Sequence, residues 1–314
     1  KGFLIGKENK GLSSMFTMMN LERIIVGIQG LGIAETAYQN SLAYCKERKQ
    51  GKSNDNKNNE TDLIIKHADI RRSLMTMKSL IEGQRSLAFW LSQQVDVSLN
   101  HSNDQIRKEA DDMVSLMTPV VKSFFSDTGM EITNEAIQVF GGYGYTRDQG
   151  IEQLYRDNRI TPIYEGTNSV QAIDLVFRKV LANKILDKFV NLIQNEIKNN
   201  KDNQELKRFI EILEKKIIIL QDFAKWLEEK LKVQKDDVSA ACNDFLKVLS
   251  YVALGFSWLK MTKISYENSN KNKDFYDEKI NTAKYFFDKI FPRVESHYQS
   301  AIAGSESIMK AKFN

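Results

Sequence analysis

Apolar residues recur three and four positions apart over the first fifty residues, and no proline interrupts the chain between Leu12 and Gln50. This spacing is typical of one face of an α-helix, so it predicts a single helix of roughly 55 Å over that range. Small residues also recur three or four apart along this segment, and we expect them to let a second helix approach closely. They are Gly27, Gly30, Ala34 and Ala37.

The same periodicity predicts two further long helices, from His67 to Val97 and from Asp104 to Phe140, the second ended by the glycine-rich run 141–144. Their lengths indicate an antiparallel bundle. The polar, low-complexity stretch 51–60 is predicted to be a solvated loop, and we assign it no function.

After Pro162 the pattern predicts one helix from Asn168 to Asn199, and Asn168 followed by Gln171 matches a capping box. A polar linker, 200–203, precedes further amphipathic segments that predict a second helical domain over 200–314. These segments are 204–232, 236–266, 274–291 and 294–310.

The aromatic residues of this second domain are expected in its core rather than in a cofactor site. They include Trp226, Trp258, Phe286 and Phe287.

The first residues differ from the helical segments, because Gly2 to Gly6 form a short apolar stretch typical of a β-strand. No second strand is predicted nearby that could pair with it. We therefore expect it to be the last strand of a domain whose remainder lies outside this sequence.

Composition excludes several classes of function. Of 314 residues, 42% are hydrophobic and 27% charged, and a net charge of +4 is spread over interspersed lysines and acids, so neither nucleic acid nor an anionic membrane is indicated. The most apolar stretch, 24–34, is too short for a membrane span. Cys45 and Cys242 belong to no metal spacing, so we expect buried thiols in a cytoplasmic protein.

Three histidines occur, His67, His101 and His297, and none lies among acids or cysteines at a ligand spacing. A zinc site or a histidine-based triad is therefore not indicated, and any chemistry would use carboxylates. Composition and periodicity alone leave an all-α protein of unknown role.

Three motifs in the middle of the chain are more specific. In order they are Ala136–Tyr145 (AIQVFGGYGY), Tyr155–Asp157 (YRD) and Ile163–Asn168 (IYEGTN). Together they resemble the C-terminal domain of the FAD-dependent acyl-CoA dehydrogenases.

Upstream segments resemble one subgroup of that family, typified by the 3-methylmercaptopropionyl-CoA dehydrogenases, which carries an extra helical domain after the common core. These segments are 15–23 (MFTMMNLER), 29–38 (QGLGIAETAY), 47–51 (ERKQG) and 67–72 (HADIRR).

The resemblance implies a fold made of an N-terminal helical domain, a middle β-domain and a C-terminal four-helix bundle. This sequence would enter at the end of the β-domain, residues 1–11. The bundle would follow over 12–199 and an appended helical domain over 200–314, with the first two domains of the family absent.

The reaction implied by the resemblance is α,β-dehydrogenation of an acyl-CoA thioester to the 2-enoyl-CoA, with hydride transfer to FAD. Glu165 matches the family's usual α-proton base, and Ile163 and Tyr164 give its carboxylate an apolar approach. Gly166 allows a tight turn, and the backbone amide of Glu165 would polarise the thioester carbonyl. Glu22 is a rival, because a minority of the family places the base on the long helix.

Cofactor contacts are also implied by resemblance. Arg48 matches the arginine that meets the FAD pyrophosphate of a neighbouring subunit, a role suited to a planar cation. Thr167 precedes a helix N-terminus, whose amides favour an anion. Residues matching the adenosine and pyrophosphate segment are Gln138, Gly141 and Gly142, and His67 is expected near the adenine.

Asn20, Arg23 and Gly166 are the residues expected to bind substrate. The implied partners are an acyl-CoA, an electron-transfer flavoprotein as acceptor and further copies of the chain in a homodimer or homotetramer. Two alternatives stay open: a non-catalytic helical fragment or subunit that needs a separate N-terminal half, and an acyl-CoA oxidase.

Overall fold

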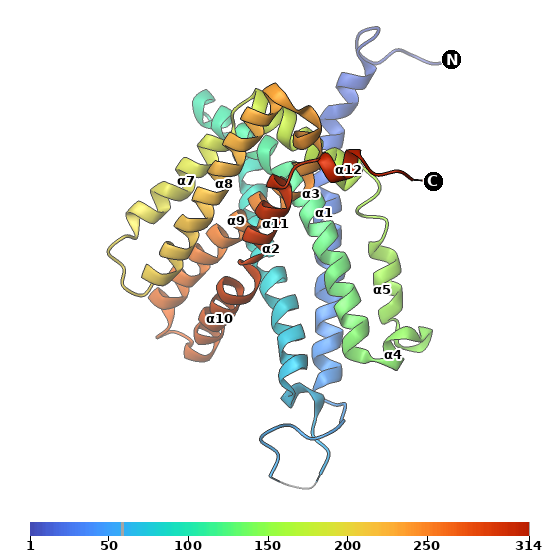
Figure 1. The fold of residues 1–314 in the computed structure, drawn as a ribbon, viewed down its shortest axis with the longest axis vertical. Coiled ribbons are helices and arrows are strands. Elements are labelled where there is room, and N and C mark those ends of the chain that lie inside the picture. The colour runs from blue at the N-terminus through green and yellow to red at the C-terminus, as the bar shows by residue number, and fades with distance from the viewer. Residues whose placement is uncertain (58–59, 314) are drawn as a thin grey trace.

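The computed structural model describes residues 1–57 and 60–313, apart from the side chains of Ser13 and Thr17. The predicted all-α fold is confirmed (Figure 1). Three long helices form its first part: α1 (Gly11–Cys45), α2 (Ala68–Asn100) and α3 (Asp104–Phe140). The predicted start and end of α3 are confirmed, whereas α1 ends five residues earlier than expected because the chain turns into a loop after Cys45.

The predicted close approach of a helix to the small residues of α1 is confirmed. A Cβ at Gly27 would lie 2.6 Å from the carbonyl oxygen of Val121, and one at Gly30 would lie 3.1 Å from that of Phe125. Ala34 and Ala37 are fully buried. Glycine's weak helix propensity is therefore offset by direct backbone packing of α1 on α3.

Short elements follow the bundle: α4 (Gly142–Tyr145), the 3₁₀ turn η2 (Arg147–Gln149) and α5 (Ile151–Asn158). Figure 1 shows α5 beside α1 and α3, and all three helices are in contact. The chain then crosses through Pro162 and reaches α6 (Asn168–Asp174).

The single helix expected from Asn168 to Asn199 is wrong. The structure has α6, then a π-helix η3 (Leu175–Ala182), then α7 (Leu186–Asn199), with Lys184 at φ 53° between them. A left-handed residue cannot continue a right-handed helix, so the chain changes direction there. The capping box is wrong too, because Thr167 is the N-cap and its Oγ1 accepts from the amide of Val170 at 3.4 Å.

The four amphipathic segments expected after residue 203 are helical, although the last two are divided. They form α8 (Lys207–Val233), α9 (Lys235–Asn268), α10 (Lys273–Tyr285) continued by the π-turn η4 (Phe286–Ile290), α11 (Arg293–Ile302) and α12 (Glu306–Met309). Gly304, at φ 80°, separates the last two helices.

Helix α9 joins the later helices to the bundle. A Cβ at Gly83 of α2 would lie 2.8 Å from Nε1 of Trp258, which donates to the carbonyl of Ser79 at 3.1 Å. One hydrophobic core therefore runs from the bundle into the later helices.

The core assignments are confirmed for Trp258, Phe286 and Phe287, while Trp226 is half-buried against the core. Both cysteines are buried and free as expected. Burial raises the pKa of Cys45 to about 11 and that of Cys242 to about 12.

The strand expected at residues 2–6 is not formed, and residues 1–5 have no regular secondary structure. A strand needs a neighbouring strand for its hydrogen bonds, and among the described residues the one β-bridge joins Lys49 to Leu63. In the described ranges, none of the helices combines the length and apolar character needed to span a bilayer.

Candidate functional site

The site residues predicted from the sequence lie in two places on the bundle. The first is an open hollow at the end formed by the last turns of α1 and α3 and the first turn of α2, which we call the bundle-end cleft. The second is the bend of residues 162–168 that leads into α6, which we call the Glu165 turn.

The bundle-end cleft has a volume of about 720 Å³. Five of the six residues predicted to bind the cofactor line it, although they come from three separate parts of the chain. They are Arg48, His67, Gln138, Gly141 and Gly142.

One wall of the cleft is the segment between α1 and α2. It folds back on itself, with the amide of Ile64 donating to the carbonyl of Arg48 at 2.8 Å. Asp62 holds this segment by accepting from Lys66 Nζ at 2.8 Å and from the amide of Ser53 at 3.0 Å. The Lys66 bond, followed by those from Ser53, keeps the pKa of Asp62 well below its usual range.

Residues 58 and 59 of the predicted loop lie outside the described residues. At the end of the segment, Nε2 of His67 lies 2.8 Å from the carbonyl oxygen of Gln50. These bonds bring Arg48 and His67 to the same wall of the cleft.

The opposite wall is glycine-rich and open. Gly141 has φ 62° and ψ −140°, a conformation essentially confined to glycine. A Cβ added at Gly141 or Gly142 would meet nothing within 4 Å, so any side chain there would occupy the cleft.

Aromatic rings complete the cleft. Tyr44 and Phe140 stack with their centroids 4.2 Å apart, and the guanidinium of Arg48 lies 5.4 Å from the ring centroid of Tyr143. Arg48 is exposed, and it forms no ion pair with a described carboxylate. An unpaired planar cation opposite bare glycine backbone fits a dinucleotide with a pyrophosphate.

The Glu165 turn has an unusual backbone. Glu165 has φ 54° and Gly166 φ 84°, so two consecutive residues are left-handed. Gln171 holds them by donating from Nε2 to the carbonyl of Glu165 at 3.1 Å, and a Cβ on Gly166 would lie 2.7 Å from that same Nε2. A left-handed glutamate is uncommon and costs free energy, so the surrounding contacts must stabilise it.

The side chain of Glu165 is half-buried, and its Oε2 atom is buried without a hydrogen-bond partner. Within the described ranges, the backbone amide of Glu165 also donates no hydrogen bond. The turn therefore offers one free acceptor and one free donor from the same residue. Beside it, the hydroxyl of Tyr164 donates to Gln29 of α1.

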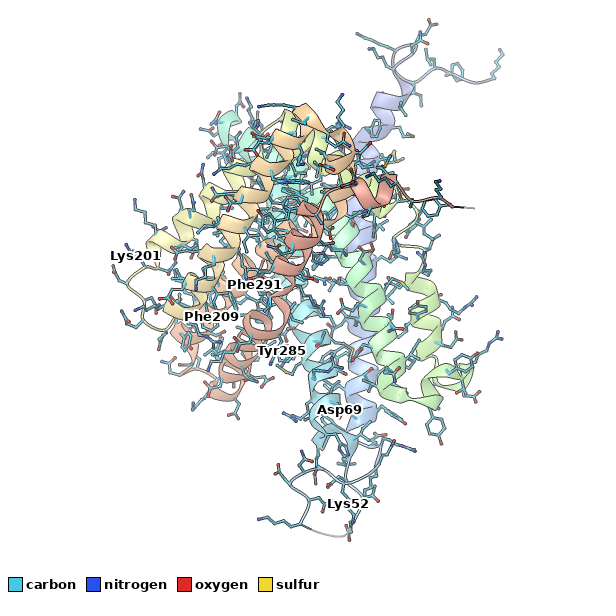
Figure 2. The ribbon with its side chains drawn as sticks, viewed as in Figure 1. Lys52, Asp69, Lys201, Phe209, Tyr285 and Phe291 are labelled. Atoms are coloured by element: carbon cyan, nitrogen blue, oxygen red, sulfur yellow. The ribbon has the colours of Figure 1, made fainter. Side chains whose placement is uncertain are left out.

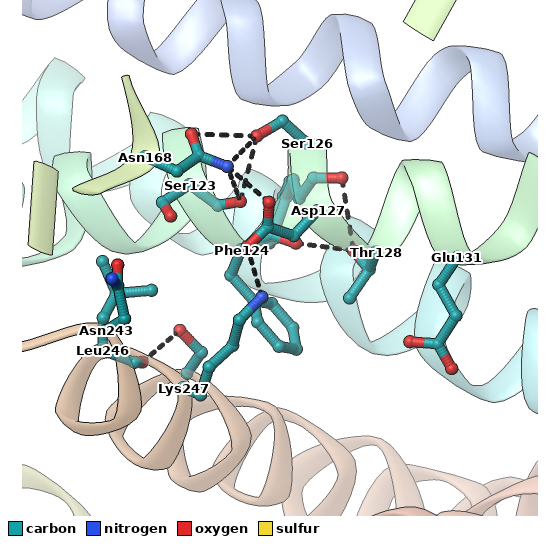
Figure 3. A network of polar contacts seen from close by, with 12 residues as sticks. Ser123, Phe124, Ser126, Asp127, Thr128, Glu131, Asn168, Asn243, Leu246 and Lys247 are labelled. Carbon is teal, nitrogen blue, oxygen red and sulfur yellow. Dashed lines mark hydrogen bonds and ion pairs between the residues drawn. The ribbon is translucent and has the colours of Figure 1, made fainter. Parts of the chain in front are cut away.

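A polar network fixes the end of this turn (Figure 3). Nδ2 of Asn168 donates to Asp127 Oδ1 at 2.6 Å, to Ser126 Oγ at 3.0 Å and to the carbonyl of Ser123 at 3.2 Å. On its other side Asp127 forms an ion pair with Lys247 of α9. The turn is thus tied to α3 and, through Asp127, to the helices beyond residue 200.

Lys122 is a part of this network that sequence reasoning missed. It is fully buried, and its Nζ donates to Oδ1 of Asn168 at 2.9 Å. Burial lowers the pKa of Lys122 to about 8. The positive charge of Arg23 lowers this pKa further, whereas the negative charges of Asp127 and Glu165 raise it. A lysine inside the apolar run 120–125 was the available signal.

Two predicted substrate residues, Asn20 and Arg23, line a small cavity of about 150 Å³ between α1, α3, the end of α6 and the middle of η3. Nε of Arg23 is buried there without a partner. Arg23 and Glu165 form no described contact with each other, but the charges of both act on the pKa of Lys122. Gly166 lies in the turn itself, and the rival base Glu22 is half-buried on α1.

Thr167 does not join the other five residues predicted to bind the cofactor. Its neighbour Asn168 contacts α3 at residues 123–127, whereas Gln138 lies in the cleft. At 1.5 Å per residue these positions are roughly 20 Å apart along α3. One chain therefore presents its predicted flavin contacts in two separate places, five in the cleft and Thr167 in the turn.

Comparison with known families gives two adjoining matches. Residues 9–180 match the family described as acyl-CoA dehydrogenase, C-terminal domain. Residues 189–312 match the family described as acetyl-CoA dehydrogenase C-terminal like.

Individual proteins are similar over one or both parts. The chain is 43% identical to a 3-methylmercaptopropionyl-CoA dehydrogenase of Ruegeria pomeroyi over 57% of this chain and 30% of that protein. It is 30% identical to a broad-specificity linear acyl-CoA dehydrogenase of Mycobacterium tuberculosis over 94% of this chain and 51% of that protein. The matched part of the chain thus spans 30% of the length of the first relative and 51% of the length of the second.

A solved structure shares the fold. The acyl-CoA dehydrogenase of Bacillus anthracis, in complex with FAD, superimposes with a TM-score of 0.74 at 21% identity, covering 97% of this chain and 52% of that one. The fold of the bundle and of the later helices is therefore found together in a solved protein.

Proposed function

Because the chain belongs to the acyl-CoA dehydrogenase family, we propose that it is the C-terminal part of an FAD-dependent enzyme that converts an acyl-CoA thioester to the 2-enoyl-CoA. The observation that carries this proposal is the Glu165 turn. It holds a half-buried carboxylate whose inner oxygen has no hydrogen-bond partner among the residues that the structure describes. A general base must be free to accept a proton from substrate, and Glu165 meets that condition.

The chain's own residues would act on the two ends of the reacting bond system. Glu165 removes the proton from the α-carbon, while its backbone amide donates a hydrogen bond to the thioester oxygen and stabilises the charge that develops there. Bound FAD would supply the acceptor for the hydride that leaves the β-carbon. Gln171 and Asn168 would hold the turn in position during both events.

The separation of Thr167 from the bundle-end cleft supports an oligomeric site. Thr167 begins α6, next to Glu165, whereas Arg48 lies in the cleft roughly 20 Å away along α3. One chain would therefore contribute Thr167 to one flavin and Arg48 to the flavin of a neighbouring subunit. A homodimer or a homotetramer provides this arrangement.

The exposed side chains in the first half of α1 indicate that another polypeptide surface packs against this helix. Large apolar side chains are exposed along it, and such a patch marks an interaction surface. They are Leu12, Met15, Phe16, Met18, Leu21, Ile25 and Ile28. We propose that this surface contacts the β-domain that precedes the bundle in the family. The electron acceptor that we expect for the enzyme is an electron-transfer flavoprotein.

The test is Glu165→Gln in a complete enzyme that contains this chain together with the N-terminal helical domain and the β-domain of the family. The amide keeps the shape but cannot take the proton, so we expect acyl-CoA to bind and the flavin to stay oxidised when oxygen is excluded. Glu22→Gln is the matched control and should allow normal bleaching of the flavin absorbance. Normal bleaching in Glu165→Gln would overturn the assignment and favour Glu22.

A further inference from the structure

A second hollow lies where the bundle meets the later helices, and we call it the junction pocket. It has a volume of about 500 Å³, and it lies between the first turns of α2 and the segment from Tyr285 to Arg293. Figure 2 labels Tyr285 at this junction. One wall belongs to the part matched by the first family and the other wall to the part matched by the second.

The lining of the junction pocket is strongly cationic. Arg71 and Arg72 come from α2, Lys289 from η4 and Arg293 from α11, and no carboxylate among the described residues lines the pocket. Arg72 pairs with Glu135 at 3.1 Å, and Arg293 pairs with Glu131. Within the described ranges Arg71 and Lys289 form no ion pair, so both exposed cations are available to a ligand, although Arg71 also lines the adjoining hollow that contains Asp62.

Several of these groups are held in place before any ligand arrives. The guanidinium of Arg293 donates to both oxygens of Glu131, at 2.7 and 3.0 Å, and to the hydroxyl of Tyr251 at 3.1 Å. The hydroxyl of Tyr285 lies 2.8 Å from Oγ1 of Thr76 and donates to the carbonyl of Arg72 at 3.1 Å. A preorganised site loses less conformational entropy when it binds.

The chemistry of this lining selects its ligand. The guanidinium fork of Arg71 can bind phosphate oxygens in pairs, and the ammonium of Lys289 adds a point charge. Met75 and Ile290 provide apolar surface beside the cations, and the volume is in the range of small-molecule sites. We propose that the junction pocket binds an oligophosphate, the group shared by inorganic pyrophosphate and nucleoside diphosphates.

The junction pocket is separate from the bundle-end cleft, since none of its four cations lines that cleft. The proposal is therefore independent of the proposed catalytic function. An oligophosphate bound in the junction pocket would link the bundle to the helices beyond residue 200.

The test is isothermal titration of the 314-residue chain with pyrophosphate, ADP and adenosine, at low and at high salt. We expect one pyrophosphate per chain, weaker binding at high salt and no binding of adenosine. Tighter binding of ADP than of pyrophosphate would indicate a nucleotide, and equal binding an inorganic oligophosphate. The double variant Arg71→Gln/Lys289→Gln should lower the affinity about 100-fold, since each cation contributes a charge-assisted hydrogen bond.

Two control variants make the test specific. Lys284→Gln changes an exposed lysine of α10 that does not line the pocket, and Arg48→Gln changes the cation of the bundle-end cleft. Both should bind pyrophosphate as the unchanged chain does. Absence of binding at millimolar pyrophosphate, unchanged binding by the double variant, or loss of binding in Arg48→Gln would each overturn the proposal.

Discussion

The bundle-end cleft and the Glu165 turn are built in opposite ways. The cleft is open, its cation Arg48 pairs with no carboxylate of the described residues, and an added Cβ at Gly141 or Gly142 would meet nothing within 4 Å. The turn is packed against fully buried groups, and Asn168 forms hydrogen bonds through both its side-chain oxygen, Oδ1, and its side-chain nitrogen, Nδ2. For the proposed function, this comparison indicates that the acid–base part of the site would be complete within this chain, whereas the proposed flavin part would need further surfaces.

The largest expected effect comes from removing the centre of the network. Asn168→Ala would leave the buried Lys122 without its acceptor at 2.9 Å, so we expect the free energy of unfolding to fall by about 3 kcal/mol. Urea unfolding measures this. Asn40→Ala is the matched control, because Asn40 is exposed and its described side-chain hydrogen bond goes to Thr36 of its own helix. Equal losses in the two variants would contradict the account.

The titration of Lys122 should be visible in the pH dependence of stability. Its pKa in the folded chain is about 8, below the usual value of about 10.4. Between these values the unfolded chain binds the proton and the folded chain does not, so the free energy of unfolding should rise with pH, by up to about 1.4 kcal/mol per unit.

Lys122→Met removes this contribution and leaves the other titrating groups in place. The difference in unfolding free energy between the two proteins should be constant below pH 8 and change steadily from pH 8 to 10. A difference that stays constant over the whole range would show that Lys122 titrates normally.

The two neighbouring glycines of the cleft differ in backbone conformation, so replacing each one by alanine isolates the cost of backbone strain. Gly141→Ala forces a side chain into a positive φ and should cost about 1 to 2 kcal/mol in the free energy of unfolding. Gly142→Ala has open space and no positive φ, so its stability should change by less than about 0.5 kcal/mol. Thermal unfolding of both variants checks this, and similar melting temperatures would argue against the described backbone.

The smallest effect is expected at the link between the turn and α9. Lys247→Met removes the ion pair with the half-buried Asp127 and should cost about 1 kcal/mol. Lys225→Met is the control, since Lys225 and Asp222 are exposed and 4.0 Å apart. A double-mutant cycle with Asp127→Asn that shows no coupling would remove Lys247 from the network.

Much of the fold could be predicted from the sequence, because helical periodicity and the glycines of α1 are local signals. The break at Lys184 could not, since neither proline nor glycine marks it and only packing selects the left-handed residue. The two π-helical stretches, η3 and η4, likewise carry no local sequence signal.

The site was predictable to a different degree in its two parts. Sequence motifs indicated the residues that the structure gathers in the cleft, and they indicated Glu165 and Gly166 in the turn. They did not indicate Lys122 or Lys247, because the partners of these lysines lie 46 and 120 residues away along the chain. Long-range pairing of this kind is set by tertiary packing rather than by local spacing.

The most direct test of the contrast between the two regions is flavin retention by the 314-residue chain itself. The purified chain is mixed with excess FAD, passed through a desalting column and examined by visible absorbance and circular dichroism, and a short acyl-CoA is then added without oxygen. The account predicts a strongly helical chain that retains no flavin. Bound flavin that bleaches with acyl-CoA would contradict it, since the cleft would then be complete without another surface.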